Sequence, residues 1–122
     1  MRHRVKGKKL GRDTSHRKAL RKNLATSLIK YDGLVTTITK AKYLKPYIER
    51  LVTKAKNYSG SEFNTRKYLN SKLFEETAVD KLINEIAPRY KNRKGGYTKV
   101  VRLGNRSGDN SMLAKISFVE EK

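Results

Sequence analysis

Positive charge in this chain is concentrated in two segments, and this distribution limits what the chain can fold into. Residues 1–30 carry 11 basic side chains and one acidic side chain, and residues 89–106 carry seven basic side chains and no acidic one. The 58 residues between them hold ten basic and seven acidic side chains, a mixture typical of an ordinary globular surface. The net charge of +19 opposes a compact state by self-repulsion unless a polyanion neutralises it. Nucleic acid is the first candidate for that polyanion, and an anionic membrane is the second.

The apolar content is enough for one modest core. Leu, Ile, Val and Phe make up 28 of the 122 residues, slightly above the roughly 20% below which a highly charged chain is expected to be disordered. We therefore expect an extended basic arm over residues 1–13 and a single globular domain over residues 14–122. No apolar run reaches the roughly 18 residues of a membrane span, and no apolar stretch follows the basic start as in a secretory signal. The absence of cysteine fits a reducing compartment.

Apolar periodicity and turn residues predict an α+β fold. The expected helices cover residues 14–30, 40–56, 61–71 and 75–87, and the expected strands cover residues 34–39, 97–103 and 112–119. Thr14 or Ser15 is expected to cap the first helix. Pro46 is expected to kink the second helix or delay its start, residues 57–60 to end it, and Pro88 to stop the last helix. The simplest architecture is a small mixed three-stranded sheet packed on one face with three to four helices.

The first predicted helix separates charge from apolar residues along its axis. Four cations occupy its first turns: Arg17, Lys18, Arg21 and Lys22. At about 100° per residue, Arg17 and Arg21 project in nearly the same directions as Leu24 and Leu28, which follow them. A membrane-surface helix needs charged and apolar residues on opposite faces throughout its length. The axial pattern instead favours a helix whose N-terminal end leaves the core and meets phosphate, which free N–H groups and the helix dipole also attract.

The second basic segment begins with residues 89–96 (RYKNRKGG), which lead into a predicted strand. Gly95 and Gly96 allow the backbone to approach a ligand closely. Tyr97 either stacks on a base or packs in the core, and its position at a strand edge favours the core. Arg102 and Arg106 extend the basic patch towards the next loop. This segment is therefore the second candidate site for a polyanion.

Residues that could carry catalysis are poorly placed. The carboxylates on residues 75–87 favour solubility, and no pair of acidic residues has the spacing of an acid–base couple or a metal site. His3 and His16, the two histidines, lie among cations that oppose protonation and metal binding. Neither a P-loop nor GxGxxG occurs. We expect no enzyme, no metal and no cofactor. A nucleoid-type DNA-binding protein, a nuclease and a basic membrane-surface protein remain as alternatives.

Four motifs occur in order along the chain: TSHRKA, TTITKAKYLK, GGYTK and GNRSGDN. Together they closely resemble the bacterial L17 family of large-subunit ribosomal proteins, over essentially the whole chain. The resemblance implies an α+β protein of the large ribosomal subunit that binds 23S ribosomal RNA near the exit of the polypeptide tunnel, with neighbouring ribosomal proteins as further partners. It also implies that the arm and the start of the first helix lie against RNA.

The candidate RNA-binding residues come from the arm, the first helix and the second basic segment. They are Arg2, His3, Arg4, Lys6, Lys8, Lys9, Arg12, Ser15, His16, Arg17, Lys18, Arg21, Lys22, Arg93, Lys94, Gly95, Gly96, Tyr97, Arg102 and Arg106. Contacts to phosphate and sugar would fix the position of the protein, and RNA shape and 2′-hydroxyls would supply selectivity. No membrane and no small-molecule substrate is expected as a partner.

Overall fold

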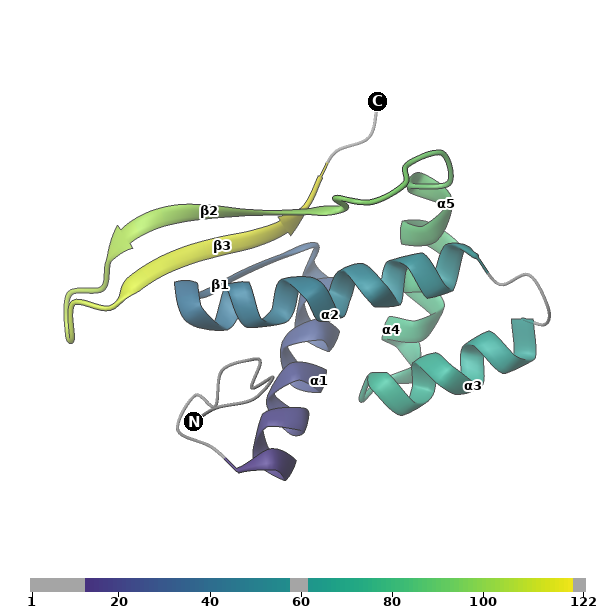
Figure 1. Ribbon diagram of the computed structural model, residues 1–122, viewed down its shortest axis with the longest axis horizontal. Helices are drawn as coiled ribbons and strands as arrows, with labels where there is room; N and C mark the ends of the chain where they lie inside the picture. Colours follow the sequence, from purple (N-terminus) through teal and green to yellow (C-terminus); the bar gives the residue numbers. More distant parts are fainter. Residues whose placement is uncertain (1–12, 58–61, 120–122) are drawn as a thin grey trace, which may run out of the picture.

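The computed structural model describes residues 13–57 and 62–119, which form helices packed against one sheet (Figure 1). In chain order the elements are α1 (Thr14–Tyr31), β1 (Gly33–Thr37), α2 (Ile38–Lys56), α3 (Glu62–Lys72), α4 (Glu76–Lys81), η1 (Leu82–Ile86), α5 (Ala87–Arg89), β2 (Thr98–Asn105) and β3 (Met112–Phe118). The segments α4, η1 and α5 follow one another without a break and act as one helical unit. The predicted α+β class is confirmed.

The sheet has the strand order β1-β3-β2, and both pairings are antiparallel. The sheet was expected to be mixed, and that strand direction is wrong. The sequence does not determine it, because the long helical connection between β1 and β2 allows β2 to run in either direction. Ile116 of the central strand is opposite Leu34 on one side and Val100 on the other. These three side chains face the helices, while Val35 and Val101 on the other face are exposed. The helices thus cover one face of the sheet, as predicted.

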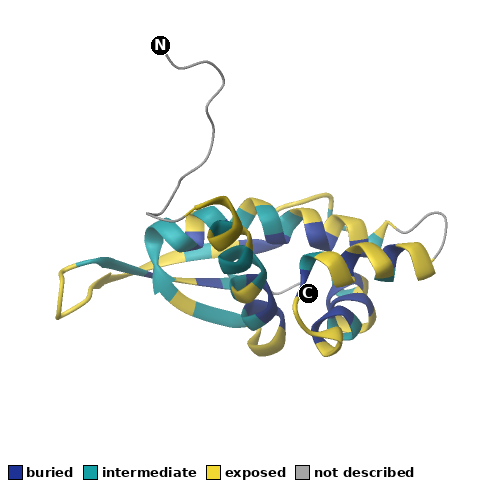
Figure 2. Cartoon of the chain, turned by 90° about the horizontal axis from the view of Figure 1, so that it is seen from below, coloured by how far each residue is buried: buried dark blue, intermediate teal, exposed yellow. Residues whose placement is uncertain are grey.

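The core is built around α2, which lies along the sheet (Figure 1). The predicted apolar stripe is buried: Ala41, Leu44, Ile48, Leu51 and Ala55 are at most 1% exposed. Leu82 and Ile86 of η1, which packs against α2, complete this core. Figure 2 shows the buried residues gathered in the body of the molecule, while the end of the β2–β3 hairpin is exposed. The small core expected from the composition is therefore shared by nearly every element.

α1 is divided along its length in the way its sequence predicts. Its buried residues, Ala25, Thr26, Leu28 and Ile29, all belong to the second half. Residues 13–23 are exposed or half-buried, and this end points away from the sheet (Figure 1). Asp32, in a left-handed conformation (φ 59°), ends the helix and turns the chain into β1. The basic end of α1 therefore projects beyond the core that its apolar end helps to form.

Two boundaries near α2 differ from the predictions. Ile38 and Thr39 belong to α2 and not to β1, because Thr37 is the last residue of β1 with a partner, Leu113, on β3. Pro46 lies inside α2, so the helix does not start late. A proline removes one N–H from the helix, but Pro46 is exposed while the opposite stripe is buried. Burial of that stripe offsets the missing backbone hydrogen bond.

The last helical unit does not stop before Pro88. It continues to Arg89, because η1 is a π-helical turn in which the Ala87 N–H donates to the Leu82 carbonyl oxygen. This wider turn changes the hydrogen-bonding register immediately before the proline. Pro88 then occupies the start of α5, where a missing N–H is tolerated. β2 is also longer than predicted, because Gly104 (φ 122°) allows a bulge that carries the strand on to Asn105.

Candidate nucleic-acid interface

The first turn of α1 is organised by Asp13, the residue before the helix. Its backbone is extended, and its Oδ1 accepts a hydrogen bond from the His16 N–H at 2.8 Å. Thr14 and Ser15 are the first two helical residues, so the prediction that one of them caps the helix is wrong. A carboxylate accepts this bond as well as a hydroxyl does, and its charge is favourable at a helix N-terminus. One of the N–H groups expected to be free for phosphate is therefore already bonded.

Two cations, Arg17 and Lys18, lie on this first part of the helix. Arg17 folds back over the first turn, where its Nε donates to the Asp13 carbonyl oxygen (3.4 Å) and its Nη2 to Thr14 Oγ1 (3.2 Å). Lys18 is exposed and has no hydrogen-bond or ion-pair partner among the described residues. Ser15 and His16 are also exposed. The structure thus leaves the charge of Lys18 available at the projecting end of α1.

Arg21 and Lys22, one turn later, lie against the protein. The guanidinium carbon of Arg21 is 5.4 Å from the ring centroid of Tyr43 and 5.0 Å from that of Tyr47. Lys22 Nζ is 5.4 Å from the ring centroid of Phe74. A cation over an aromatic face is attracted by the negative charge of that face. Both side chains are half-buried, so these two cations also join α1 to its neighbours.

The second basic segment is tied to the end of α2 by Lys56. Lys56 Nζ donates to the carbonyl oxygens of Tyr90 (3.3 Å) and Arg93, and it lies 5.0 Å from the ring centroid of Tyr97. An ammonium group that donates to two carbonyls of one loop fixes the course of that loop. Lys56 is a positioning residue that the sequence analysis missed.

The tip of this loop is exposed. Arg93 Nε donates to the carbonyl oxygens of Gly95 (3.1 Å) and Gly96 (3.2 Å), so this side chain is partly used within its own loop. Lys94, Gly95 and Gly96 are exposed. Gly96 has φ 64°, a left-handed conformation that glycine adopts without strain. The loop therefore presents Lys94 and a glycine backbone to solvent.

Tyr97 packs in the core and does not present its ring to a base. This is the alternative that its position at a strand edge favoured. It is 1% exposed, and its ring centroid is 5.4 Å from that of Tyr90. Its N–H donates to Glu49 Oε2 (2.8 Å), and its hydroxyl donates to the Arg93 carbonyl oxygen (3.4 Å) and accepts from Thr53 Oγ1 (3.3 Å). In this arrangement the ring packs at a tilt against Tyr90 inside the core and is closed to a base.

The arginines of the hairpin differ in how their charge is used. Arg102 is exposed on β2. Arg106 instead donates from Nε (3.0 Å) and Nη2 to the two carboxylate oxygens of Asp109, which also accepts the Ser111 N–H (3.1 Å). The guanidinium of Arg106 and these hydrogen bonds hold the pKa of Asp109 well below its ordinary value. The structure therefore gives Arg106 a role in shaping the hairpin loop.

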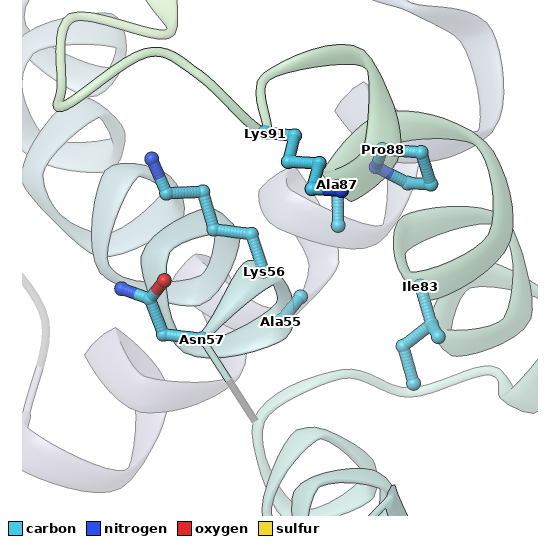
Figure 3. Close-up of a pocket in the computed structure, with 7 residues that line it drawn as sticks. All are labelled: Ala55, Lys56, Asn57, Ile83, Ala87, Pro88 and Lys91. Carbon is cyan, nitrogen blue, oxygen red and sulfur yellow. The ribbon is translucent and has the colours of Figure 1, made fainter. Parts of the chain in front are cut away.

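A hollow of about 610 Å³ lies between the end of α2 and the unit formed by η1 and α5 (Figure 3). Its lining residues are Ala55, Lys56, Asn57, Ile83, Ala87, Pro88 and Lys91. None of these carries a carboxylate, an imidazole or a nucleophilic hydroxyl. Lys56, at its edge, is occupied by the loop carbonyls described above. Lys91 is the other lining group that could act as a base or nucleophile, and no carboxylate or imidazole among the lining residues would activate it.

The described parts of the two basic segments lie on opposite sides of α2. Figure 1 shows the start of α1 on one side and β2 on the other. The seven candidate residues of the arm, from Arg2 to Arg12, lie outside the described residues. The structure therefore does not gather the described candidates into one continuous patch, and α2 separates them.

Comparison with known proteins identifies the family. The family model described as "Ribosomal protein L17" matches residues 20–119. The chain is 50% identical over 119 residues to the large ribosomal subunit protein bL17 of Aliarcobacter butzleri, covering 98% of this chain and all of that one. It is 47% identical over 120 residues to bL17 of Orientia tsutsugamushi (98% and 81% covered) and 42% identical over 127 residues to bL17 of Petrotoga mobilis (100% and 99% covered). The chain belongs to the ribosomal protein L17 family.

This membership confirms the resemblance seen in the four motifs, and it confirms that the chain is a structural ribosomal protein and not an enzyme. In the described part of this L17 family member, no helix is long and apolar enough to cross a membrane. Residues 13–57 and 62–119 also contain no cluster of three or more His, Cys, Asp or Glu side chains that could hold a metal ion.

The sequence analysis of this L17 family member missed the charge of α2. α2 carries six cations and one carboxylate, Glu49. Its positive charge is hidden in a count over residues 31–88, because residues 57–88 carry more acidic than basic side chains. Arg50 and Lys54 are exposed on this helix. A charge count made element by element, and not over the whole central region, would have found them.

Proposed function

We propose that this chain is a structural component of the large ribosomal subunit that binds 23S ribosomal RNA and supports subunit assembly near the exit of the polypeptide tunnel, beside neighbouring ribosomal proteins. Family membership supports this, since the curated relatives carry the name of a large-subunit protein. The basic arm over residues 1–13 would extend the contact from a globular domain over residues 14–122.

One observation carries the proposal: α1 is a single helix of which only the second half is buried. The projecting half holds Lys18 without a partner among the described residues and Arg17 at the surface of the first turn. Cations near a helix N-terminus oppose its dipole by about 0.3–1 kcal/mol each when exposed. Their accumulation here is unfavourable in the isolated protein and becomes favourable when phosphate lies beside them.

Binding would proceed by charge neutralisation. Lys and Arg side chains that contact phosphates release the counterions condensed on the RNA, so affinity depends steeply on salt. Contacts to phosphate and sugar fix the position of the protein without reading bases. Selectivity would come from RNA shape and 2′-hydroxyl groups. The exposed tip at Lys94, Gly95 and Gly96 would form a second contact, with Arg102 beside it on β2.

The experiment compares Lys18→Ala with Lys67→Ala, using a labelled fragment of 23S ribosomal RNA. Lys67 is a matched control, because it too is an exposed helical lysine without a partner among the described residues, but it lies on α3. We expect Lys18→Ala to weaken binding several-fold and to lower the salt slope by about 1. Lys67→Ala should bind as the wild type does.

Duplex DNA as competitor tests the class of nucleic acid. Weak competition by duplex DNA is expected, since a strand directly follows α1 and the compact spacing of a helix-turn-helix is missing. Equal competition by duplex DNA would favour a nucleoid-type DNA-binding protein. If the Lys18→Ala variant binds the RNA fragment with wild-type affinity, the projecting half of α1 does not have the proposed role in binding.

A further inference from the structure

A small cationic cavity lies where α1, α2 and α3 meet. Its volume is about 120 Å³, and its lining residues are Arg21, Tyr47, Arg50, Leu51, Tyr68 and Lys72. Three of these six side chains are cations, and none is acidic. Like charges repel more strongly where solvent is partly excluded. A cluster of this kind is therefore favourable only when an anion lies among the cations.

Arg21 brings an unsatisfied donor to the cavity. Its guanidinium is held over the rings of Tyr43 and Tyr47, and its Nε is shielded from solvent without a hydrogen-bond partner. Buried polar groups in native proteins are nearly always hydrogen-bonded. A guanidinium keeps its charge at any physiological pH and presents several donors in a planar fork. An anion in the cavity would supply the counter-charge that this guanidinium lacks among the described residues.

The walls of the cavity are fixed by tyrosines. The hydroxyl of Tyr47 donates to the Lys72 carbonyl oxygen at 2.7 Å and so ties α2 to the end of α3. Burial raises the pKa of Tyr47, while Arg21 and Arg50 act in the opposite direction. Nζ of Lys72 lies 5.5 Å from the ring centroid of Tyr68. These contacts keep the cationic groups beside the cavity without neutralising them.

Two carboxylates on the helices that line the cavity, Glu49 of α2 and Glu62 of α3, have partners elsewhere. Glu49, next to Arg50 in the sequence, accepts the N–H of Tyr97. Glu62 of α3 is paired with Arg66. In residues 13–57 and 62–119, neither Arg50 nor Lys72 forms an ion pair. The described structure therefore leaves all three cations of the cavity without a counter-charge.

We propose that Arg21, Arg50 and Lys72 form a binding site for one backbone phosphate of ribosomal RNA. The site rests on the proposed function, because it assigns a phosphate contact to the RNA that the chain would bind. The cavity is small, about 120 Å³, which suits a phosphate group better than a nucleotide or a peptide segment. The planar fork of Arg21 matches the geometry of phosphate oxygens.

A wider hollow of about 520 Å³ adjoins this cavity, because Arg50 and Tyr68 line both. Its lining also includes Lys54 of α2 and Gly95, in the exposed tip of the second basic segment, together with Glu49, whose carboxylate accepts the Tyr97 N–H. An RNA backbone that places one phosphate in the cavity can continue along this hollow to that tip. α2 would then connect the two basic segments, which otherwise lie on opposite sides of it.

The test uses full-length variants and the labelled 23S fragment, with affinity measured between 50 and 200 mM salt. Arg50→Gln removes an exposed cation and should leave folding intact, which thermal unfolding checks. We expect it to weaken binding and to lower the salt slope by about 0.7–0.9, the contribution of one phosphate. Lys67→Gln removes the same charge from α3 outside the cavity and should match the wild type. Arg21→Lys keeps the charge but loses the planar fork, and it should also weaken binding.

The outcomes separate this site from the proposed function. If Lys18→Ala weakens binding and Arg50→Gln matches Lys67→Gln, the cavity is not a phosphate site, while RNA binding stands. If the wild type binds the fragment with no salt dependence, the proposed function fails as well. If Arg50→Gln binds the fragment normally but no longer enters large subunits, the cavity holds an acidic surface of a neighbouring protein, and the phosphate assignment is overturned.

Discussion

The first turns of α1 and the loop at the end of the β2–β3 hairpin both project beyond the core. In the first turns of α1 four cations follow one carboxylate, Asp13, whereas the hairpin loop holds one cation and one carboxylate. In α1, Asp13 accepts a backbone N–H and so caps the helix, which leaves Lys18 without a partner among the described residues. In the hairpin loop, Asp109 accepts two donors from Arg106 and neutralises it. The carboxylate of α1 thus leaves an uncompensated charge beside it, whereas that of the hairpin loop makes a self-contained turn.

The largest expected effect separates the core half of α1 from its projecting half. Leu28 is fully buried, so Leu28→Ala should reduce the free energy of unfolding by about 2–5 kcal/mol through lost burial and a residual cavity. Leu20, half-buried in the projecting half, is the control, and Leu20→Ala should cost less than about 1 kcal/mol. Denaturant unfolding measures both. Equal losses would show that the two halves are equally part of the core.

The next effect concerns the cap of the projecting half. Asp13→Ala removes the acceptor for the His16 N–H and should reduce stability by about 0.5–2 kcal/mol. Amide exchange in the first turn should accelerate, because the helix would fray from that end. Asp13→Asn keeps an oxygen acceptor and should retain most of the cap. If Asp13→Ala changed neither stability nor exchange, Asp13 would not organise this end of α1.

A smaller effect concerns the charge of the hairpin loop. The double variant Arg106→Ala with Asp109→Ala keeps the net charge of the chain and removes both members of the ion pair. If Arg106 is neutralised by Asp109, this variant should bind the RNA fragment within about twofold of the wild type, a change smaller than that of Lys18→Ala. Loss of affinity as large as that of Lys18→Ala would instead show that Arg106 contacts RNA directly.

The smallest effect is the pH dependence of the same loop. The pKa of Asp109 is lowered in the folded protein from its ordinary value of 3.8. Its contribution to stability is therefore complete above that ordinary value and is lost as pH falls through the lower folded pKa. NMR shifts of the loop amides should stay constant from neutral pH to about pH 4 and change only in stronger acid. A change centred near neutral pH would contradict the ion pair.

Much of the fold could be predicted from periodicity and turn residues. The buried stripe from Ala41 to Ala55 follows directly from the spacing of apolar residues, because residues that face the core recur with the helical period. The same spacing shows that only the second half of α1 is buried. The end of β1 could not be predicted, because Ile38 is as suitable for a strand as Thr37, although the chain turns into α2 at Ile38. The π-turn that precedes Pro88 depends on packing of Leu82 and Ile86 against α2, which no local pattern contains.

The candidate site was predictable in its segments and less so in its residues. The sequence identifies where cations gather, because their number is explicit. It does not show that Arg106 pairs with Asp109, that Arg21 lies over two tyrosines, or that Lys56 holds the loop after α5. Each of these is a contact between elements or across a turn. The cations of Arg50 and Lys72 become a cluster only after α2 and α3 pack together.

The most direct test of the account is the salt dependence of binding between the full chain and a 23S ribosomal RNA fragment. The account predicts that affinity falls by roughly 10³–10⁵ between 50 and 200 mM salt, as expected for 6–10 phosphate contacts. Lys18→Ala should reduce that slope, and Lys67→Ala should leave it unchanged. An affinity that does not change with salt would contradict binding by charge neutralisation.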